Sequence, residues 1–149
     1  MLGTLNRDAI AALIPHQGAM CLLSTVERYD ERTIVCHATS HASEGNPLRI
    51  GGRLPALAGI EYGAQALAVH CALINGDAAG NRARGVLAGA RDVALNVDRL
   101  DDVPGPLTVR AERLVSDPPR LLYGFVIEDE GRELVSGRVA VVLSGRDKP

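Results

Sequence analysis

The chain has 149 residues, a formal net charge of −2 and a hydrophobic share of 46%. This length and composition suit one domain with an apolar core over residues 1–149 and argue against wholesale disorder. The low charge and the 3% share of aromatic residues disfavour a basic or base-stacking nucleic-acid binder. Because the N-terminus lacks a basic start with an apolar leader and no apolar run reaches about 20 residues, we expect a cytoplasmic protein without a membrane span.

The first part of the chain predicts one short helix and two strands. The helix is expected over Arg7–Ile14, with Asn6 or Asp8 as its N-cap. Strand-like segments follow at Met20–Tyr29 and Thr33–Thr39, and the second of them alternates between its two faces. A tight polar turn between them predicts an antiparallel pair.

A long loop and a long apolar helix occupy the middle of the sequence. The loop, Ser40–Leu54, contains several glycines and prolines, and loops of this length inside a compact domain are often functional. The helix is predicted over Ala56–Ile74, with Pro55 at its first turn and Asn75-Gly76 at its end. Because this helix is apolar on nearly every side, we expect it to be buried in the centre of the fold.

After the polar segment Asp77–Arg84, the remaining sequence is typical of β structure joined by short turns. Such consecutive strands form antiparallel sheets. The sequence therefore predicts an α+β protein in which a curved antiparallel sheet of about five or six strands wraps around one long helix, the hotdog arrangement. The four strands expected here are Gly85–Leu100, Leu107–Ser116, Leu121–Asp129 and Glu133–Leu143.

Cysteine and histidine spacings predict neither a disulfide nor a metal site. The three cysteines, Cys21, Cys36 and Cys71, have mainly apolar neighbours and form no CxxC motif, so we expect buried reduced thiols. His37 and His41 would lie about 13 Å apart if the strand continued, at roughly 3.3 Å per residue, which is too far to share a metal ion. Motifs for nucleotide, flavin, zinc and serine-hydrolase chemistry are absent.

Three stretches resemble the (3R)-hydroxyacyl-ACP dehydratases of bacterial fatty-acid synthesis, the FabZ/FabA hotdog type. Ile14–Leu23 (IPHQGAMCLL) resembles the family's LPHRxPFLLVD segment, and Pro55–Gln65 (PALAGIEYGAQ) resembles its PGVLxxEAMAQ helix start. Arg91-Asp92 and Val103–Gly105 follow in the order of its KxRFxxPVxPGD segment. The words NPLR, GRLPAL and GIEYxAQ are similar to the divergent ApeP-like dehydratases encoded with aryl-polyene lipid pathways.

The resemblance implies an activity, a substrate carrier and an assembly. Members dehydrate 3-hydroxyacyl thioesters to trans-2-enoyl thioesters in fatty-acid or polyene-type lipid biosynthesis. The acyl group is carried on the phosphopantetheine arm of acyl carrier protein (ACP) or coenzyme A, and no further cofactor is needed. Hotdog chains commonly join two sheets edge to edge, so we expect a homodimer or a higher oligomer, with a heterodimer as the alternative.

The catalytic histidine of the family is missing from its usual place. In the family it lies in an HFPG motif, fourteen residues before the helix carboxylate, where this chain has Pro47 before Glu61. The carboxylate therefore carries over and the histidine does not. His41, earlier in the same loop, is the nearest replacement in the sequence.

Dehydration of a 3-hydroxyacyl thioester needs a base, an acid and a donor to the thioester oxygen. Glu61 is our candidate acid, because carboxyl groups in apolar surroundings can serve as acids; a buried glutamate bonded to backbone or to a dimer partner is the alternative. His41 is the candidate base, although a solvated loop histidine is the alternative. The amides of Ala58 and Gly59 at the helix start are the candidate oxyanion donors, with Gly59 allowing close approach.

Four further residues are candidates with open alternatives. Gln65 is expected on the same helix face as Glu61, where it could orient the acid, hold the hydroxyl, or be a core amide bonded to backbone. Asn46 could bond the thioester oxygen or simply form a turn before proline. His16 matches a family position, and the resemblance implies a structural residue there that could also line the substrate tunnel. His70 is expected on the opposite helix face, in the core or at a dimer contact.

Two other functions stay open from the sequence. An acyl-thioesterase on the same fold would use Glu61 to activate water or to attack the thioester. A non-catalytic acyl-binding subunit of a hotdog heterodimer would explain the missing histidine motif. Arg49 and Arg53 flank the loop and could meet an acidic carrier protein, or be solvated surface residues.

Overall fold

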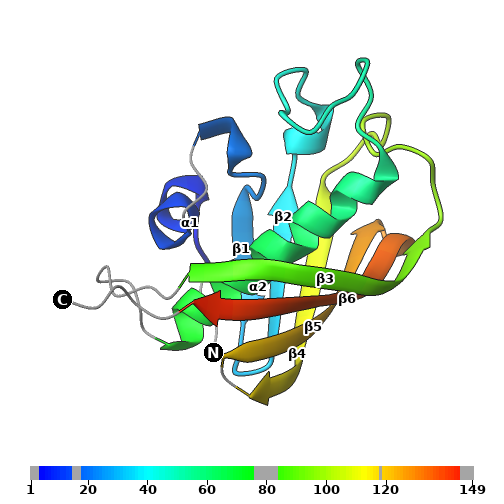
Figure 1. Cartoon of the computed structure of the whole chain (residues 1–149). Helices are drawn as coiled ribbons and strands as arrows, with labels where there is room; N and C mark the ends of the chain where they lie inside the picture. The colour runs from blue at the N-terminus through cyan, green and yellow to red at the C-terminus, as the bar shows by residue number, and fades with distance from the viewer. Residues whose placement is uncertain (1–3, 15–17, 76–83, 118, 145–149) are drawn as a thin grey trace.

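The computed structural model describes residues 4–14, 18–75, 84–117 and 119–144 (Figure 1). Within these ranges the chain forms a six-stranded sheet and one long helix, with a short helix and three 3₁₀ turns. The elements are α1 (Arg7–Leu13), η1 (Gly18–Met20), β1 (Thr25–Tyr29), β2 (Thr33–Ala38), η2 (Ser40–Ala42), η3 (Ala56–Ala58), α2 (Gly59–Asn75), β3 (Arg84–Leu95), β4 (Leu107–Asp117), β5 (Arg120–Asp129) and β6 (Arg132–Ser144).

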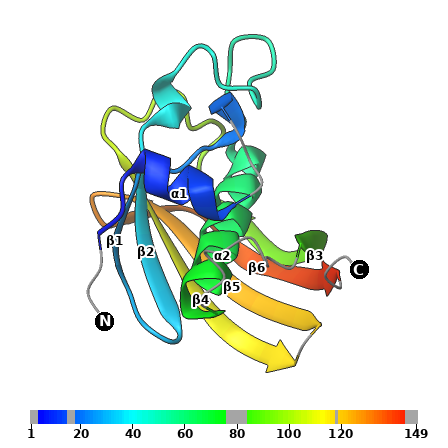
Figure 2. The same cartoon turned by 90° about the vertical axis from the view of Figure 1, so that its left-hand side faces the viewer.

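The sheet has the strand order β1-β2-β4-β5-β6-β3, and every neighbouring pair is antiparallel. It curves around α2, which lies in the hollow of the sheet (Figure 2). In the β5–β6 hairpin, Glu130 and Gly131 both have positive φ angles, 50° and 83°, the backbone that a two-residue turn between twisted strands requires. The predicted α+β hotdog architecture is confirmed, and the sheet has six strands.

The predicted first strand, Met20–Tyr29, is too long at its start, because β1 begins only at Thr25. Side chains form hydrogen bonds with backbone carbonyl and amide groups that would otherwise bond to a neighbouring strand. The Nε2 of Gln65 donates to the Met20 carbonyl at 2.6 Å, and its Oε1 accepts from the Leu22 amide at 2.9 Å. Since these polar groups are satisfied locally, the segment is fixed without strand partners.

The predicted strand Gly85–Leu100 ends early, at Leu95. The chain then leaves the sheet and bonds to the segment that precedes α2. The Leu100 amide donates to the Leu54 carbonyl at 2.8 Å, and the Ala56 amide donates to the Asp98 carbonyl at 3.0 Å. This contact between distant segments ties the start of the long helix to the loop after β3.

Helix α2 forms the centre of the fold, and each of its side chains from residue 59 to 74 is buried or half-buried. A Cβ on Gly59 would lie 2.9 Å from Cδ1 of Ile127, and one on Gly63 would lie 2.6 Å from Cγ of Phe125. The two glycines therefore let the helix approach the sheet closely. The stretch Ala56–Ile74 is long and apolar enough to cross a membrane, which corrects the sequence-based expectation, but it packs as a core helix.

Candidate active site

The loop after β2 and the segment after β3 both lie at the end of the molecule where α2 begins (Figure 1). Asp101 anchors the second of them. Its Oδ1 accepts from the Leu54 amide at 2.9 Å and from Nε of Arg99 at 3.0 Å. The arginine holds the pKa of Asp101 below its usual value. Leu54, before η3, and Ala56, the first residue of η3, are thus fixed against residues 98–101.

His41, the predicted base, is buried in η2 with 2% of its surface exposed. Its Nε2 lies 3.1 Å from the carbonyl oxygen of Val103. Because a carbonyl can only accept, Nε2 carries the proton of the neutral ring, and Nδ1 is left with its lone pair. Nδ1 is buried and forms no hydrogen bond with any residue that the structure describes. An oriented imidazole with a free lone pair is the form that a general base needs.

The guanidinium of Arg49 bonds to two backbone carbonyls of the same loop. Its Nη1 donates to the Gly52 carbonyl at 2.9 Å, and its Nη2 donates to the His41 carbonyl at 3.2 Å. Its Nε is the other buried side-chain nitrogen or oxygen without a partner in the described part of the chain, besides Nδ1 of His41. Two guanidinium nitrogens of Arg49 are therefore bonded within the loop. These bonds do not favour the contact with an acidic carrier protein that was considered for Arg49.

A hydrogen-bond network ties this loop to α2 through Tyr62. The Tyr62 hydroxyl lies 2.8 Å from Oγ of Ser40 and 3.1 Å from Nδ2 of Asn46. Ser40 Oγ also donates to the Leu22 carbonyl at 2.7 Å, and Oδ1 of Asn46 accepts from the Leu48 amide at 2.8 Å. The contacts of Asn46 are thus internal to the loop and to Tyr62, as in the turn-forming alternative.

Glu61, the predicted acid, lies in the first turn of α2, directly before Tyr62. It is half-buried and forms no hydrogen bond or ion pair with the residues described. In the described residues Glu61 bonds to no backbone group, so the backbone half of the alternative given for it is not seen. Gln65 is not available to orient it, because both polar atoms of Gln65 bond to the backbone of Met20 and Leu22. These are the contacts of the core-amide alternative.

The amides predicted as oxyanion donors are engaged within the helix start. The Ala58 amide donates to the Pro55 carbonyl at 2.9 Å, and the Gly59 amide donates to the carbonyls of Ala56 and Leu57. The helix begins with the tighter turn η3, whose i→i+3 bonds use these donors. The missing Cβ of Gly59 faces the sheet and not a ligand, which corrects the reason given for this residue.

The other two predicted histidines lie elsewhere. His16 is outside the residues that the structure describes. His70 is fully buried on the far side of α2: its Nε2 donates to the Asp30 carbonyl at 2.7 Å, and its Nδ1 accepts from the Tyr123 hydroxyl at 2.5 Å. Burial lowers its pKa, mainly because the charged ring would lose its hydration. His70 is a core residue, one of the two expectations for it.

Sequence reasoning missed three residues of this site, namely Tyr62, Ser40 and Val103. Tyr62 carried a usable signal, because a tyrosine within an otherwise apolar helix needs a partner for its hydroxyl when it is buried. The partners themselves, a loop serine and a backbone carbonyl 62 residues from His41, depend on the path of the chain. No local pattern indicates them.

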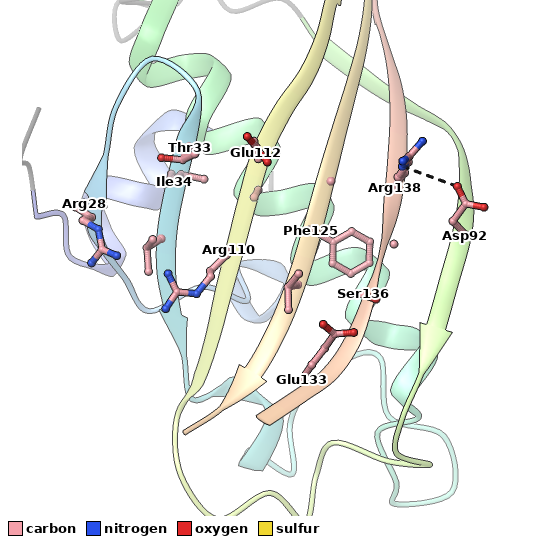
Figure 3. A pocket seen from close by; sticks show the side chains of 15 residues that line it. Arg28, Thr33, Ile34, Asp92, Arg110, Glu112, Phe125, Glu133, Ser136 and Arg138 are labelled. Atoms are coloured by element: carbon pink, nitrogen blue, oxygen red, sulfur yellow. Dashed lines mark ion pairs between the residues drawn. The ribbon is translucent and has the colours of Figure 1, made fainter. Parts of the chain in front are cut away.

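A hollow of about 590 Å³ lies on the opposite face of the sheet from α2 (Figure 3). Two of its arginines are paired: Arg138 lies 3.8 Å from Asp92 in the same lining, and Arg110 lies 2.9 Å from Glu128, which does not line the hollow. Neither Glu61 nor His41 lines it. The two candidate acid–base residues therefore do not line this hollow, and no cluster of metal-binding side chains occurs in the ranges that the structure covers.

A curved antiparallel sheet around a buried helix defines a hotdog protein. In the described residues, an unpartnered carboxyl lies in the first turn of that helix, and an imidazole with one unpartnered nitrogen lies in the loop that bonds to this turn. The family model of the ApeP-like dehydratases matches residues 8–147. The chain therefore belongs to the ApeP-like dehydratase family. No curated protein sequence matches it.

Solved structures agree with the fold. The chain is similar to one in the dehydratase heterocomplex ApeI:P from Xenorhabdus doucetiae, with a TM-score of 0.81 and 24% identity over 91% of each chain. It is also similar to a hypothetical thioesterase with coenzyme A from Streptococcus pneumoniae, with a TM-score of 0.56 and 16% identity over 83% of this chain and 87% of that one. AziG of S. sahachiroi gives a TM-score of 0.54 and 20% identity over 84% of this chain and 92% of its own.

Proposed function

We propose that this chain dehydrates 3-hydroxyacyl thioesters to trans-2-enoyl thioesters, with the acyl group on the phosphopantetheine arm of ACP or coenzyme A, in fatty-acid or polyene-type lipid biosynthesis. The observation that carries the proposal is the buried Nδ1 of His41, oriented by Val103 and without a partner, in the loop that bonds to the first turn of α2. Glu61, the second unpartnered group, belongs to that turn. The dehydratase family supplies the reaction class.

In the proposed reaction, Nδ1 of His41 takes the proton from C2, which is acidified by the adjacent thioester carbonyl. The carboxylic acid of Glu61 donates its proton to the C3 hydroxyl, the C3–O bond breaks, and water leaves. The electrons of the C2–H bond form the new double bond. His41 ends protonated and Glu61 ionised, so a proton passes back through solvent before the next turnover.

We propose that a second hotdog chain adds to the free edge of β3. Within the described residues β3 pairs only with β6, and Leu87 and Leu95 on it are 39% and 48% exposed. An unprotected edge with apolar side chains is a template for pairing with another strand. The relation to a chain of the ApeI:P heterocomplex supports a heterodimer as much as a homodimer.

Thioester hydrolysis is the second candidate function, favoured by the likeness to the hypothetical thioesterase with coenzyme A. There Glu61 would activate water for attack on the thioester carbonyl. The two reactions differ in one product, because hydrolysis releases a free thiol and dehydration leaves the thioester intact. A third reading makes this chain the acyl-binding subunit of a heterodimer, without turnover of its own.

The test follows purified protein with short and medium 3-hydroxyacyl-ACPs and the matching CoA thioesters. Intact mass detects the loss of water, and a thiol reagent detects hydrolysis. We expect water loss without thiol release. Thiol release would establish the thioesterase. Binding of acyl-ACP without either product would contradict a stand-alone dehydratase and favour the subunit reading, to be checked by adding a copurified hotdog partner.

A further inference from the structure

Two parts of the chain that are distant in the sequence, the loop after β2 and the start of α2, meet at the hydroxyl of Tyr62. Ser40 comes from η2, Asn46 comes from the following loop, and Tyr62 itself comes from the first turn of α2. Tyr62 has no exposed surface. Burial raises the pKa of its hydroxyl, which therefore stays neutral and keeps its proton for hydrogen bonding.

The donors and acceptors of this network have only one consistent arrangement. The hydroxyl of Ser40 donates its hydrogen bond to the Leu22 carbonyl, which can only accept. The Tyr62 hydroxyl must therefore donate to Oγ of Ser40, and it accepts from Nδ2 of Asn46. The tyrosine hydroxyl therefore both donates and accepts a hydrogen bond. The network fixes one geometry, and its hydroxyl proton is not available to a substrate.

We propose that Tyr62 is a positioning residue whose hydroxyl fastens the turn that carries His41 to the first turn of α2, beside Glu61. Ser40 is bonded covalently to His41, and Tyr62 is bonded covalently to Glu61. The 2.8 Å contact between Ser40 and Tyr62 therefore fixes the spacing of the two groups to which we assign the proton transfers. The inference rests on the proposed function for its effect on rate, but not for its effect on His41.

The magnitude is large enough to measure. A displacement of about 1 Å in a catalytic group can lower a rate by about 100-fold, because the reacting atoms must lie within near-contact distance. Without the hydroxyl, Val103 still orients the imidazole ring, but the turn that carries His41 loses its tie to the helix. We therefore expect a kcat effect with little change in KM.

The variant Tyr62→Phe removes the hydroxyl and leaves the ring that packs in the core. Ser40 keeps its bond to the Leu22 carbonyl, and Asn46 Nδ2 keeps its 3.0 Å bond to the Ser40 carbonyl. We therefore expect the variant to fold. If it does not, Ser40→Ala removes the same contact from the loop side and is expected to act in the same direction.

Tyr123→Phe is the matched control. Tyr123 is also fully buried, and its hydroxyl also bonds a side chain across the core, but that partner is His70, about two turns further along α2 than Tyr62. Each variant loses one buried hydroxyl. We expect Tyr62→Phe to lower kcat by about 10- to 100-fold with KM nearly unchanged, and Tyr123→Phe to change neither.

Nitrogen NMR of the imidazole rings tests positioning without any turnover. The His41 signals are assigned by their loss in His41→Ala. Tyr62→Phe should shift the Nδ1 and Nε2 signals of His41 and leave those of His70 in place, and Tyr123→Phe should do the reverse. Unmoved His41 signals in Tyr62→Phe would overturn the inference, and so would a wild-type kcat. If the wild-type chain does not remove water from the substrate, only the proposed function is contradicted. The NMR result would still decide the role of Tyr62.

Discussion

The two nitrogens of His41 have different surroundings, and that difference suits the ring for the role we propose. One nitrogen is committed to the Val103 carbonyl and the other is buried with its lone pair unused. An unsatisfied buried polar atom costs about 1–3 kcal/mol. In the described residues, this atom belongs to the loop that bonds to the first turn of α2, where Glu61 also lies without a partner, and stability does not explain that arrangement.

Removing either group should stop the chemistry without unfolding the protein. We expect His41→Ala and Glu61→Gln each to lower kcat by about 100- to 10,000-fold, the range for loss of one general acid or base. Far-ultraviolet circular dichroism should stay unchanged. Steady-state kinetics on the preferred acyl thioester gives the numbers, and wild-type rates in either variant would remove that residue from the mechanism.

A glycine contact can be tested at the same scale. Gly63→Ala places a Cβ 2.6 Å from Cγ of Phe125, so we expect a loss of about 1–3 kcal/mol in the free energy of unfolding. Gly89→Ala is the control, because a Cβ there meets nothing within 4 Å. Thermal or urea unfolding measures both variants. Equal stability of the two would mean that α2 is not pressed against β5 as closely as described.

At the scale of elements, His70 joins α2 to the β1–β2 turn and to β5. The carboxylate of Asp30 accepts bonds from the Arg32 and Thr33 amides, which holds its pKa at about 2. The Asp30 carbonyl accepts from His70. The charged group of Arg113 near the ring adds to the depression of the His70 pKa that burial causes.

This arrangement predicts acid sensitivity. Because the folded-state pKa of His70 is below the unfolded value of about 6.5, the unfolded chain binds more protons as the pH falls, and stability declines below about pH 6.5. Above that pH the effect vanishes. Urea unfolding between about pH 5 and 8 should show a slope that is reduced in His70→Gln. An unchanged slope in the variant would assign the acid sensitivity to other groups.

Local sequence patterns are sufficient for the regular elements but not for their ends or for the site. Asn6 caps α1 as predicted, with its Oδ1 accepting from the Ala9 amide at 2.9 Å, and the central helix begins after Pro55 as expected. Side-chain bonds from Gln65 make the first strand begin later than predicted, and loop contacts make the third strand end earlier. Glu61 and His41 were proposed from the family's chemistry, whereas Tyr62 depends on a meeting of segments that only the folded chain creates.

At the scale of the whole molecule, the edge of β3 that has no partner strand among the described residues predicts a dimer formed through that edge. Leu87→Lys introduces a charge on that edge, and we expect it to shift the protein toward monomer. Leu114→Lys is the control, because Leu114 is equally exposed, at 39%, but lies on β4 within the sheet. Light scattering after gel filtration measures the mass of each. Dissociation by Leu114→Lys but not by Leu87→Lys would place the interface elsewhere.

We propose that this chain removes water from a 3-hydroxyacyl thioester with Glu61 and His41. This reaction is tested most directly by the intact mass of 3-hydroxyacyl-ACP after incubation with the wild-type chain and with Glu61→Gln and His41→Ala. We expect loss of one water with the wild type and an unchanged mass with both variants. Water loss that persists in either variant, or an unchanged substrate with the wild type, would contradict it.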